Sequence, residues 1–176
     1  MLIIAGVLLP AVAGVGAGAS AGAATGADAA TQLVGLFLQG CLRFAGHPAA
    51  LRDWARGNQL TALPEQGRAA FLHGAPGQAF DASAAGIKLV LVSSDDGICS
   101  AVTERAMQQP VTDALEDGLR QAGLRFRLVI ERDDKVFSAI HDREYLAAEG
   151  NHGWRILLAV VKGDRGGEAM VTAAPE

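Results

Sequence analysis

The first charged side chain of this chain is Asp28, so residues 1–27 carry no charge. Residues 2–15 form an apolar run, and Gly, Ala and Ser dominate the positions that follow. A run of this length matches the hydrophobic region of an export signal and falls short of the roughly 20 residues that a transmembrane helix needs. We therefore expect a signal peptide over residues 1–29 and a single α+β domain over residues 30–176.

Two small-x-small cleavage sites follow the apolar run, one ending at Ala23 and one at Ala29. Such sites suit a signal peptidase because only short side chains fit its recognition pockets. Residues 1–4 contain no Lys or Arg, so the basic region that normally opens a signal peptide is missing. Three alternatives to a complete, cleaved signal peptide therefore remain open. In these alternatives the true start codon lies upstream, the segment is an uncleaved membrane anchor, or it is a buried helix.

Cys41 follows Leu38, Gln39 and Gly40, a superficial likeness to the lipid-attachment site of lipoproteins. Gln39 fits that motif poorly, and Cys41 lies far from the apolar run. We therefore expect Cys41 to belong to a helix of the domain.

The chain has two cysteines, Cys41 and Cys99. In an exported protein such a pair predicts a disulfide, because the compartment is oxidising. The bond would close a loop of about 58 residues, which the chain-entropy model values at about 4 kcal/mol. Two inert thiols and a single reactive thiol remain as alternatives.

Helical periodicity marks three segments. Leu33, Phe37, Cys41 and Phe44 recur on one helical face, and Pro48 opens a second helix that ends near Gly57. The two helices form an α-hairpin. A third helix is expected over residues 110–122. Residues 61–78 are rich in Pro and Gly and are expected to be a loop with one helical turn near residues 68–72.

From Phe80 onward the pattern becomes that of strands. The turn at residues 94–97 contains Asp96-Gly97, a dipeptide typical of β-hairpins. The segment over 138–147 fits a strand or a helix, and we interpret it as a strand. The other expected strands cover residues 87–93, 98–104, 124–131, 154–161 and 168–172.

This element order predicts a two-layer α+β fold. An N-terminal α-hairpin would accompany a mainly antiparallel sheet of about six to seven strands, with one further helix on one face.

The net charge of −4 favours no nucleic-acid partner, since such proteins usually carry a basic stripe. Asp95-Asp96 resembles an acid/base pair, but a hairpin turn explains both residues. The histidines (His47, His73, His141 and His152) have no metal-ligand spacing. Ser83 lacks the Gly-x-Ser-x-Gly context of a nucleophile. We predict no catalytic residue, metal or cofactor.

The best candidate for binding is the outward face of the sheet. Strand alternation places Arg125 and Arg127 on one face, and it places His141, Arg143 and Tyr145 together on one face of the next strand. Arg155 follows on the strand after that. If these faces coincide, they form a basic patch suited to carboxylates, phosphates or an acidic protein. The alternative is an ordinary solvent face, neutralised by Glu131, Asp142 and Glu144.

Several stretches resemble a family of small exported proteins of Gram-negative bacteria that has no assigned activity, some members of which are described as lipoproteins. These stretches are residues 37–44, 80–83, 88–93, 96–99 and 154–158. The resemblance implies a location in the bacterial envelope and offers no activity.

These observations together predict a non-enzymatic domain, periplasmic or secreted, that binds a partner protein or a small anionic ligand. No stable membrane span is expected after cleavage. The alternatives are an envelope hydrolase with an unidentified site and an inhibitor of the immunity type.

Overall fold

A computed structural model describes residues 26–137, 139–164 and 166–176. The predicted signal segment lies outside these residues, apart from positions 26–29. Those positions form the first turn of helix α1 (Gly26–Leu36), where Ala29 is buried. Cleavage after Ala29 would remove the first turn of α1, whereas cleavage after Ala23 would leave the whole helix in the mature chain.

The N-terminal α-hairpin is confirmed. Helix α1 continues into a π-helical segment, η1 (Phe37–Leu42), and then α2 (Pro48–Gly57) begins at its proline. Leu33, Phe37 and Cys41 are fully buried, as their helical spacing predicts.

The described residues form one eight-stranded antiparallel sheet of order β1-β2-β3-β4-β8-β7-β6-β5. Two hairpin strands, β3 (Leu89–Ser94) and β4 (Cys99–Ala106), lead to helix α4 (Gln108–Gln121). This helix carries the chain from the middle of the sheet to its far edge at β5 (Arg125–Asp133). Successive hairpins through β6 (Ile140–Glu149) and β7 (His152–Val161) then return to β8 (Gly167–Pro175), which pairs with β4. The ambiguous segment near 138–147 is therefore a strand.

The region over 61–78 is more regular than its composition predicts. It contains β1 (Thr61–Ala62), helix α3 (Glu65–Leu72) and the start of β2 (Gly77–Asp81). The sheet therefore has eight strands where six to seven were expected. The short strands form because β3 offers β2 a hydrogen-bonding edge, which local sequence does not reveal.

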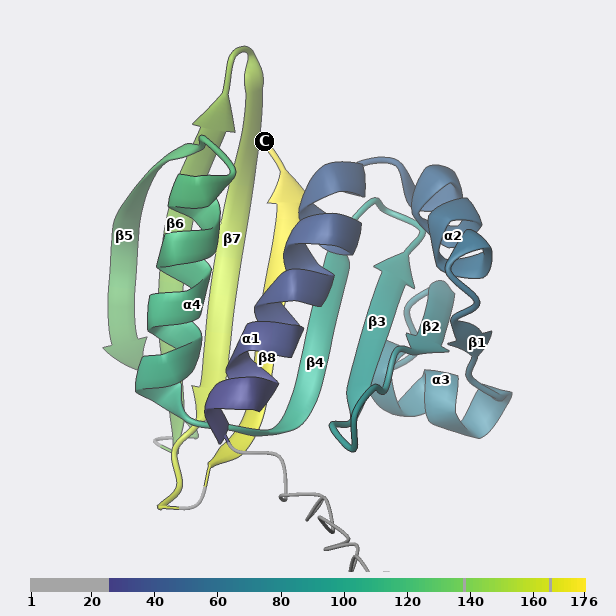
Figure 1. The fold of residues 1–176 in the computed structure, drawn as a ribbon, viewed down its shortest axis with the longest axis horizontal. Coiled ribbons are helices and arrows are strands. Elements are labelled where there is room, and N and C mark those ends of the chain that lie inside the picture. Colours follow the sequence, from purple (N-terminus) through teal and green to yellow (C-terminus); the bar gives the residue numbers. More distant parts are fainter. Residues whose placement is uncertain (1–25, 138, 165) are drawn as a thin grey trace, which may run out of the picture.

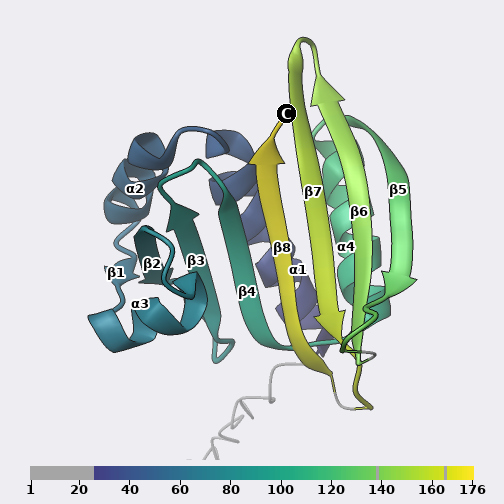
Figure 2. The ribbon, with the colours of Figure 1, turned by 180° about the vertical axis from the view of Figure 1, so that it is seen from behind.

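The helices cover the two faces of the sheet unequally. Helices α1 and α4 pack on one face and form the main core (Figure 1). Helix α3 lies on the opposite face, where Leu72 contacts Val92 and Val102. Seen from that side, strands β8, β7, β6 and β5 have no helix in front of them (Figure 2). Helix α3, which lies in a region expected to be a loop with one helical turn, therefore packs on the face opposite to α1 and α4.

Candidate functional site

The sheet register divides the predicted site residues between its two faces. Arg127, Leu146, Arg155 and Ala174 pair in one row across β5, β6, β7 and β8. The next row contains Leu128, Tyr145, Ile156 and Ala173, and its members alternate with those of the first. Tyr145, Ile156 and Ala173 belong to the helix-covered core. Arg127 and Arg155 therefore lie on the uncovered face.

His141 and Arg143 share the face of Tyr145, as the alternation predicts, but this is the helix-covered face. Arg143 pairs in register with Leu158, which is buried in the core. The single basic patch considered from the sequence is therefore not formed. Strand alternation alone does not reveal which face the helices cover.

Arg143 is the centre of a hydrogen-bonded network that ties α4 to β5 and β6. Its Nε donates to Tyr145 Oη at 2.8 Å, and its Nη1 donates to Glu131 Oε1 at 2.7 Å. Glu116 Oε1 accepts from Arg143 Nη2 at 3.2 Å and from Tyr145 Oη at 3.1 Å. Tyr145, Glu131 and Glu116 accept hydrogen bonds from all three guanidinium nitrogens of Arg143. This arginine therefore has a structural role and is not a ligand site.

Burial raises the pKa of Tyr145 to about 12. The Arg143 guanidinium opposes this shift by favouring the phenolate, but desolvation of the buried ring outweighs it. Tyr145 is thus a neutral hydrogen-bond donor at physiological pH.

Among the histidines, His141 has the contacts with carboxylates that acid/base chemistry would need. Its Nδ1 lies 3.0 Å from Asp133 Oδ1, and Nε2 lies 3.4 Å from Glu131 Oε1 without hydrogen-bond geometry. Hydrogen bonds from His141 and Lys162 lower the pKa of Asp133. Among the described residues, no Ser, Thr or Cys side chain forms a hydrogen bond with His141.

The uncovered face of β5–β8, called the open face below, carries apolar as well as charged side chains in its middle. Ile130, Leu146, Leu157 and Ala159 point to this side and are half-buried by their strand neighbours alone. No helix of the described chain covers them (Figure 2). These four side chains, called the apolar strip below, are interrupted by Glu144, which lies between Ile130 and Leu157 in register.

Arginines border this strip. Arg155 forms ion pairs with Glu144 and, at 3.7 Å, with Glu176. Arg125 and Arg127 are exposed and form no ion pair or side-chain hydrogen bond with any residue in the described ranges. Their guanidinium groups are therefore available to an external acceptor.

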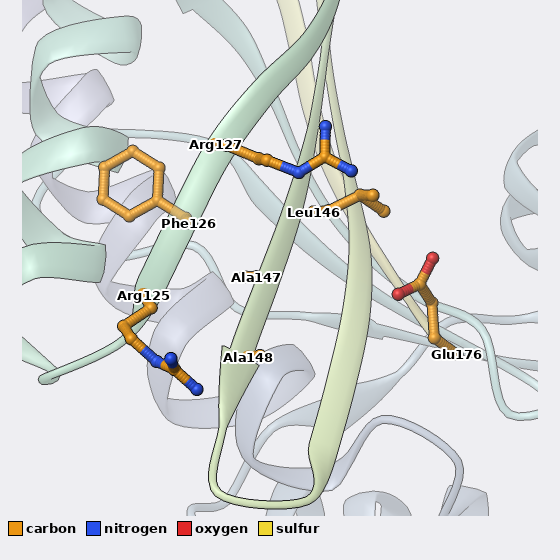
Figure 3. Close-up of a pocket in the computed structure, with 7 residues that line it drawn as sticks. All are labelled: Arg125, Phe126, Arg127, Leu146, Ala147, Ala148 and Glu176. Carbon is orange, nitrogen blue, oxygen red and sulfur yellow. The ribbon is translucent and has the colours of Figure 1, made fainter.

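A shallow hollow of about 330 Å³ adjoins these arginines (Figure 3). The side chains of Arg127, Leu146 and Glu176 lie on one side of β5, and Phe126 points to the other side. Phe126 instead packs edge-on against Tyr145, with ring centroids 5.9 Å apart. The hollow is part of the open face.

Two further hollows lie elsewhere. One, of about 280 Å³, is lined by Trp154, Leu124, Arg43 and Glu149, and another, of about 310 Å³, lies between Met107 and Lys162. His141 lines none of the three.

The predicted disulfide is confirmed. Cys41 in η1 and Cys99 at the start of β4 are bonded to each other and buried. The turn that precedes Cys99 explains the two aspartates, as expected. Asp95 pairs with Arg52, and Asp96 Oδ1 accepts the backbone N–H of Ile98 at 3.1 Å.

The remaining histidines hold structural positions. His47 precedes α2, His73 ends α3 in a left-handed conformation, and His152 lies beside Trp154. Over residues 26–137, 139–164 and 166–176, no group of three or more His, Cys, Asp or Glu side chains could hold a metal ion. In the same ranges, no helix is both long and apolar enough to cross a bilayer.

No family model, curated protein or solved structure matches this chain. The interpretation of the open face therefore depends on the residues of this chain.

Sequence reasoning missed two features of the surface. The apolar strip was not recognised because Leu157 and Ala159 lie in a continuous apolar run that gives no alternation. The exposed pair Val136 and Phe137 was assigned to no element, although two large apolar residues next to Asp and Lys in a turn are a readable signal.

Proposed function

We propose that this domain binds a partner protein through the open face. The observation that carries the proposal is the uncovered apolar strip bordered by Arg125 and Arg127, which have no ion pair among the described residues. Apolar strips rimmed by polar groups are typical of protein interaction sites.

The dimensions of the open face suit a protein partner. Its four strands have 9 or 10 residues each. With a strand spacing of about 4.8 Å and a rise of about 3.3 Å per residue, they present roughly 600 Å² in projection. Side chains increase this area toward the roughly 800 Å² per partner of a standard interface.

The charges favour a partner with acidic side chains around an apolar surface. Arginine presents a planar fork that binds carboxylates bidentately, so Arg125 and Arg127 are suited to contact such groups. The domain carries a net charge of −4, so its overall electrostatic field does not attract an acidic partner. The attraction would come only from the two arginines at the contact itself.

A small anionic ligand in the hollow beside Arg127 is the second candidate, favoured by the hollow itself. Glu176 lines the same hollow and repels an anion there, and the hollow is shallow. These features favour the protein partner.

We also propose that the domain works in an oxidising compartment, in the periplasm or outside the cell. The buried disulfide supports this location, because such bonds persist where thiols are not kept reduced.

Affinity capture from an envelope extract, with three forms of the chain as bait, tests the partner proposal. We expect wild type to recover a protein that the charge-reversed variant Arg125→Glu/Arg127→Glu loses at least tenfold. The matched control, Arg43→Glu/Arg105→Glu, reverses two exposed arginines outside strands β5–β8 and should retain it.

The recovered protein is then purified and its affinity for the three forms is measured by calorimetry. Equal affinity of wild type and the open-face variant would contradict the proposal. Saturable binding of citrate that abolishes capture would instead support the small-anion candidate. Dimerisation of wild type alone in sedimentation equilibrium would assign the face to a second copy.

A further inference from the structure

A hollow of about 280 Å³ lies on the helix-covered face, at the end of the sheet where the helices stop. The hairpin of β6 and β7 projects beyond the C-terminal ends of η1 and α4 (Figure 1). Trp154 pairs in register with Ala147, which is buried in the main core, so its side chain lies on the helix-covered side. The helices leave Trp154 only half-buried, and it lines the hollow.

Apolar side chains form most of the lining of this hollow. Leu42 and Leu124 are buried, and Leu38 and Trp154 are half-buried against the main core. They come from η1, from the position between α4 and β5, and from β7. Because the core holds each of these side chains in place, the apolar part of the hollow is preformed. Such a lining favours a ligand with an apolar group.

Two charged side chains of opposite sign border the apolar lining. Arg43 follows η1, and Glu149 ends β6. Both are exposed, and neither forms an ion pair or a side-chain hydrogen bond with any residue in the described ranges. The Arg43 guanidinium lies over the ring of Phe44, 5.3 Å from its centroid, which leaves its N–H groups to an external acceptor. The two charges line one hollow without pairing with each other, so a ligand that carries both charges can bridge them.

The end of α4 adds to the negative side of the hollow. Ala122, the residue that caps the C-terminus of α4, is part of the lining. The last carbonyl groups of a helix carry partial negative charge and favour a cation nearby. Glu149 and this helix end therefore favour an ammonium group. Arg43 favours a carboxylate, which its planar fork can bind through two hydrogen bonds.

We propose that this hollow binds a small zwitterion with an apolar side chain, in the class of free apolar amino acids and dipeptides. The carboxylate contacts Arg43, the ammonium group contacts Glu149, and the apolar group packs against Trp154. A plain anion fits less well because Glu149 repels it, and a plain cation fits less well because Arg43 repels it. The volume lies below the roughly 300–1,000 Å³ of sites for drug-sized ligands, which favours a molecule of one or two residues.

Isothermal titration calorimetry on the full chain tests this proposal. L-leucine and the dipeptide leucyl-leucine are the probes, and N-acetyl-L-leucine amide, which keeps the apolar group but carries neither charge, is the control ligand. We expect saturable binding of a zwitterion at millimolar concentration or below, and none of the neutral control. The tighter of the two zwitterions then assigns the length of the ligand. Absence of saturable binding by both zwitterions, or equal binding of the neutral control, would overturn the proposal.

Ligands that lack one charge assign the roles of the two side chains. Glu149→Gln should weaken L-leucine about tenfold but not isocaproate, which lacks the ammonium group. Arg43→Gln should weaken L-leucine about tenfold but not isoamylamine, which lacks the carboxylate. The matched controls, Glu168→Gln and Arg105→Gln, remove exposed charges that line none of the three hollows and should bind L-leucine as wild type does. Equal weakening of the zwitterion and of the singly charged ligand would show an effect on the fold alone and refute the assigned contacts.

The hollow and the open face lie on opposite sides of the sheet, so the two binding sites can be tested separately. The open-face variant Arg125→Glu/Arg127→Glu should still bind L-leucine. Arg43→Glu/Arg105→Glu should lose L-leucine and still capture the partner protein. Loss of L-leucine by the open-face variant would place the ligand on the open face and contradict the proposal.

Discussion

Tyr145 shows how a single residue links the helical layer to the sheet. Its ring is fully buried against Phe126, and its hydroxyl group is shared between Arg143 and Glu116. A buried hydroxyl without partners would cost free energy, so the charged pair allows a polar group in the core.

The raised pKa of Tyr145 predicts loss of stability in alkali. In the unfolded chain the phenol ionises near 10.0, whereas in the folded domain it ionises at about 12. A group whose folded pKa is raised contributes stability below the unfolded value and loses it as the pH rises through the folded one. We expect a loss of about 2–3 kcal/mol in the free energy of unfolding across this window.

Tyr145 is the only tyrosine of the chain, so the phenolate absorption band reports on it alone. The native protein should titrate well above the urea-unfolded chain. The control, Tyr145→Phe, should lose less stability over the same window because its other groups titrate unchanged. Coincident titration of native and unfolded chains would contradict the burial argument.

At the scale of elements, the close contact of α1 and α4 depends on Gly118. A Cβ at this position would lie 2.7 Å from Leu38 Cδ1 and 3.2 Å from Val34 Cγ1. The lack of a side chain lets the two helices approach and bury Val34 and Leu115 in one core.

We expect Gly118→Val to lower the free energy of unfolding by about 1–3 kcal/mol, since overpacking forces the helices apart. The matched control is Gly35→Val in α1, where a Cβ would meet nothing within 4 Å. That change should be neutral or slightly stabilising, because valine has a better helix propensity than glycine. Urea titration of both variants checks this, and equal destabilisation would refute the packing explanation.

The elements themselves were largely predictable from local pattern. The spacing of Leu33, Phe37 and Cys41 predicted α1 and η1, and Asp96-Gly97 predicted the β3–β4 hairpin, where Gly97 has φ +91°. Strand β2 and helix α3 were underestimated, because five glycine and proline residues are spread over positions 61–78 and the order of the two elements comes from packing on β3.

At the scale of the molecule, the disulfide joins its two layers. It connects η1 in the helical layer to β4 near the middle of the sheet, over a sequence separation of 58. Both sulfurs are buried, so the bond is part of the core.

Cys41→Ala/Cys99→Ala should lower the free energy of unfolding by about 4 kcal/mol, chiefly by restoring freedom to the unfolded chain. A guanidinium titration measures the change, with the reduced and alkylated wild-type chain as a second reference. Intact mass after alkylation of the denatured, unreduced protein checks the bond itself. Two alkylated thiols there would contradict it.

The sequence by itself determined which segments form most of the strands and helices, which residues alternate together on a strand, and which two cysteines could pair. These properties depend on periodicity, turn residues and the count of thiols, all of which are local or compositional. Strand alternation also predicted that Arg125 and Arg127 face outward, but only the tertiary structure decided that Arg143 and Tyr145 face the helices. A period of two relates residues within a strand, but the side that α1 and α4 cover depends on the crossover of α4 to the far edge of the sheet and on packing between distant segments.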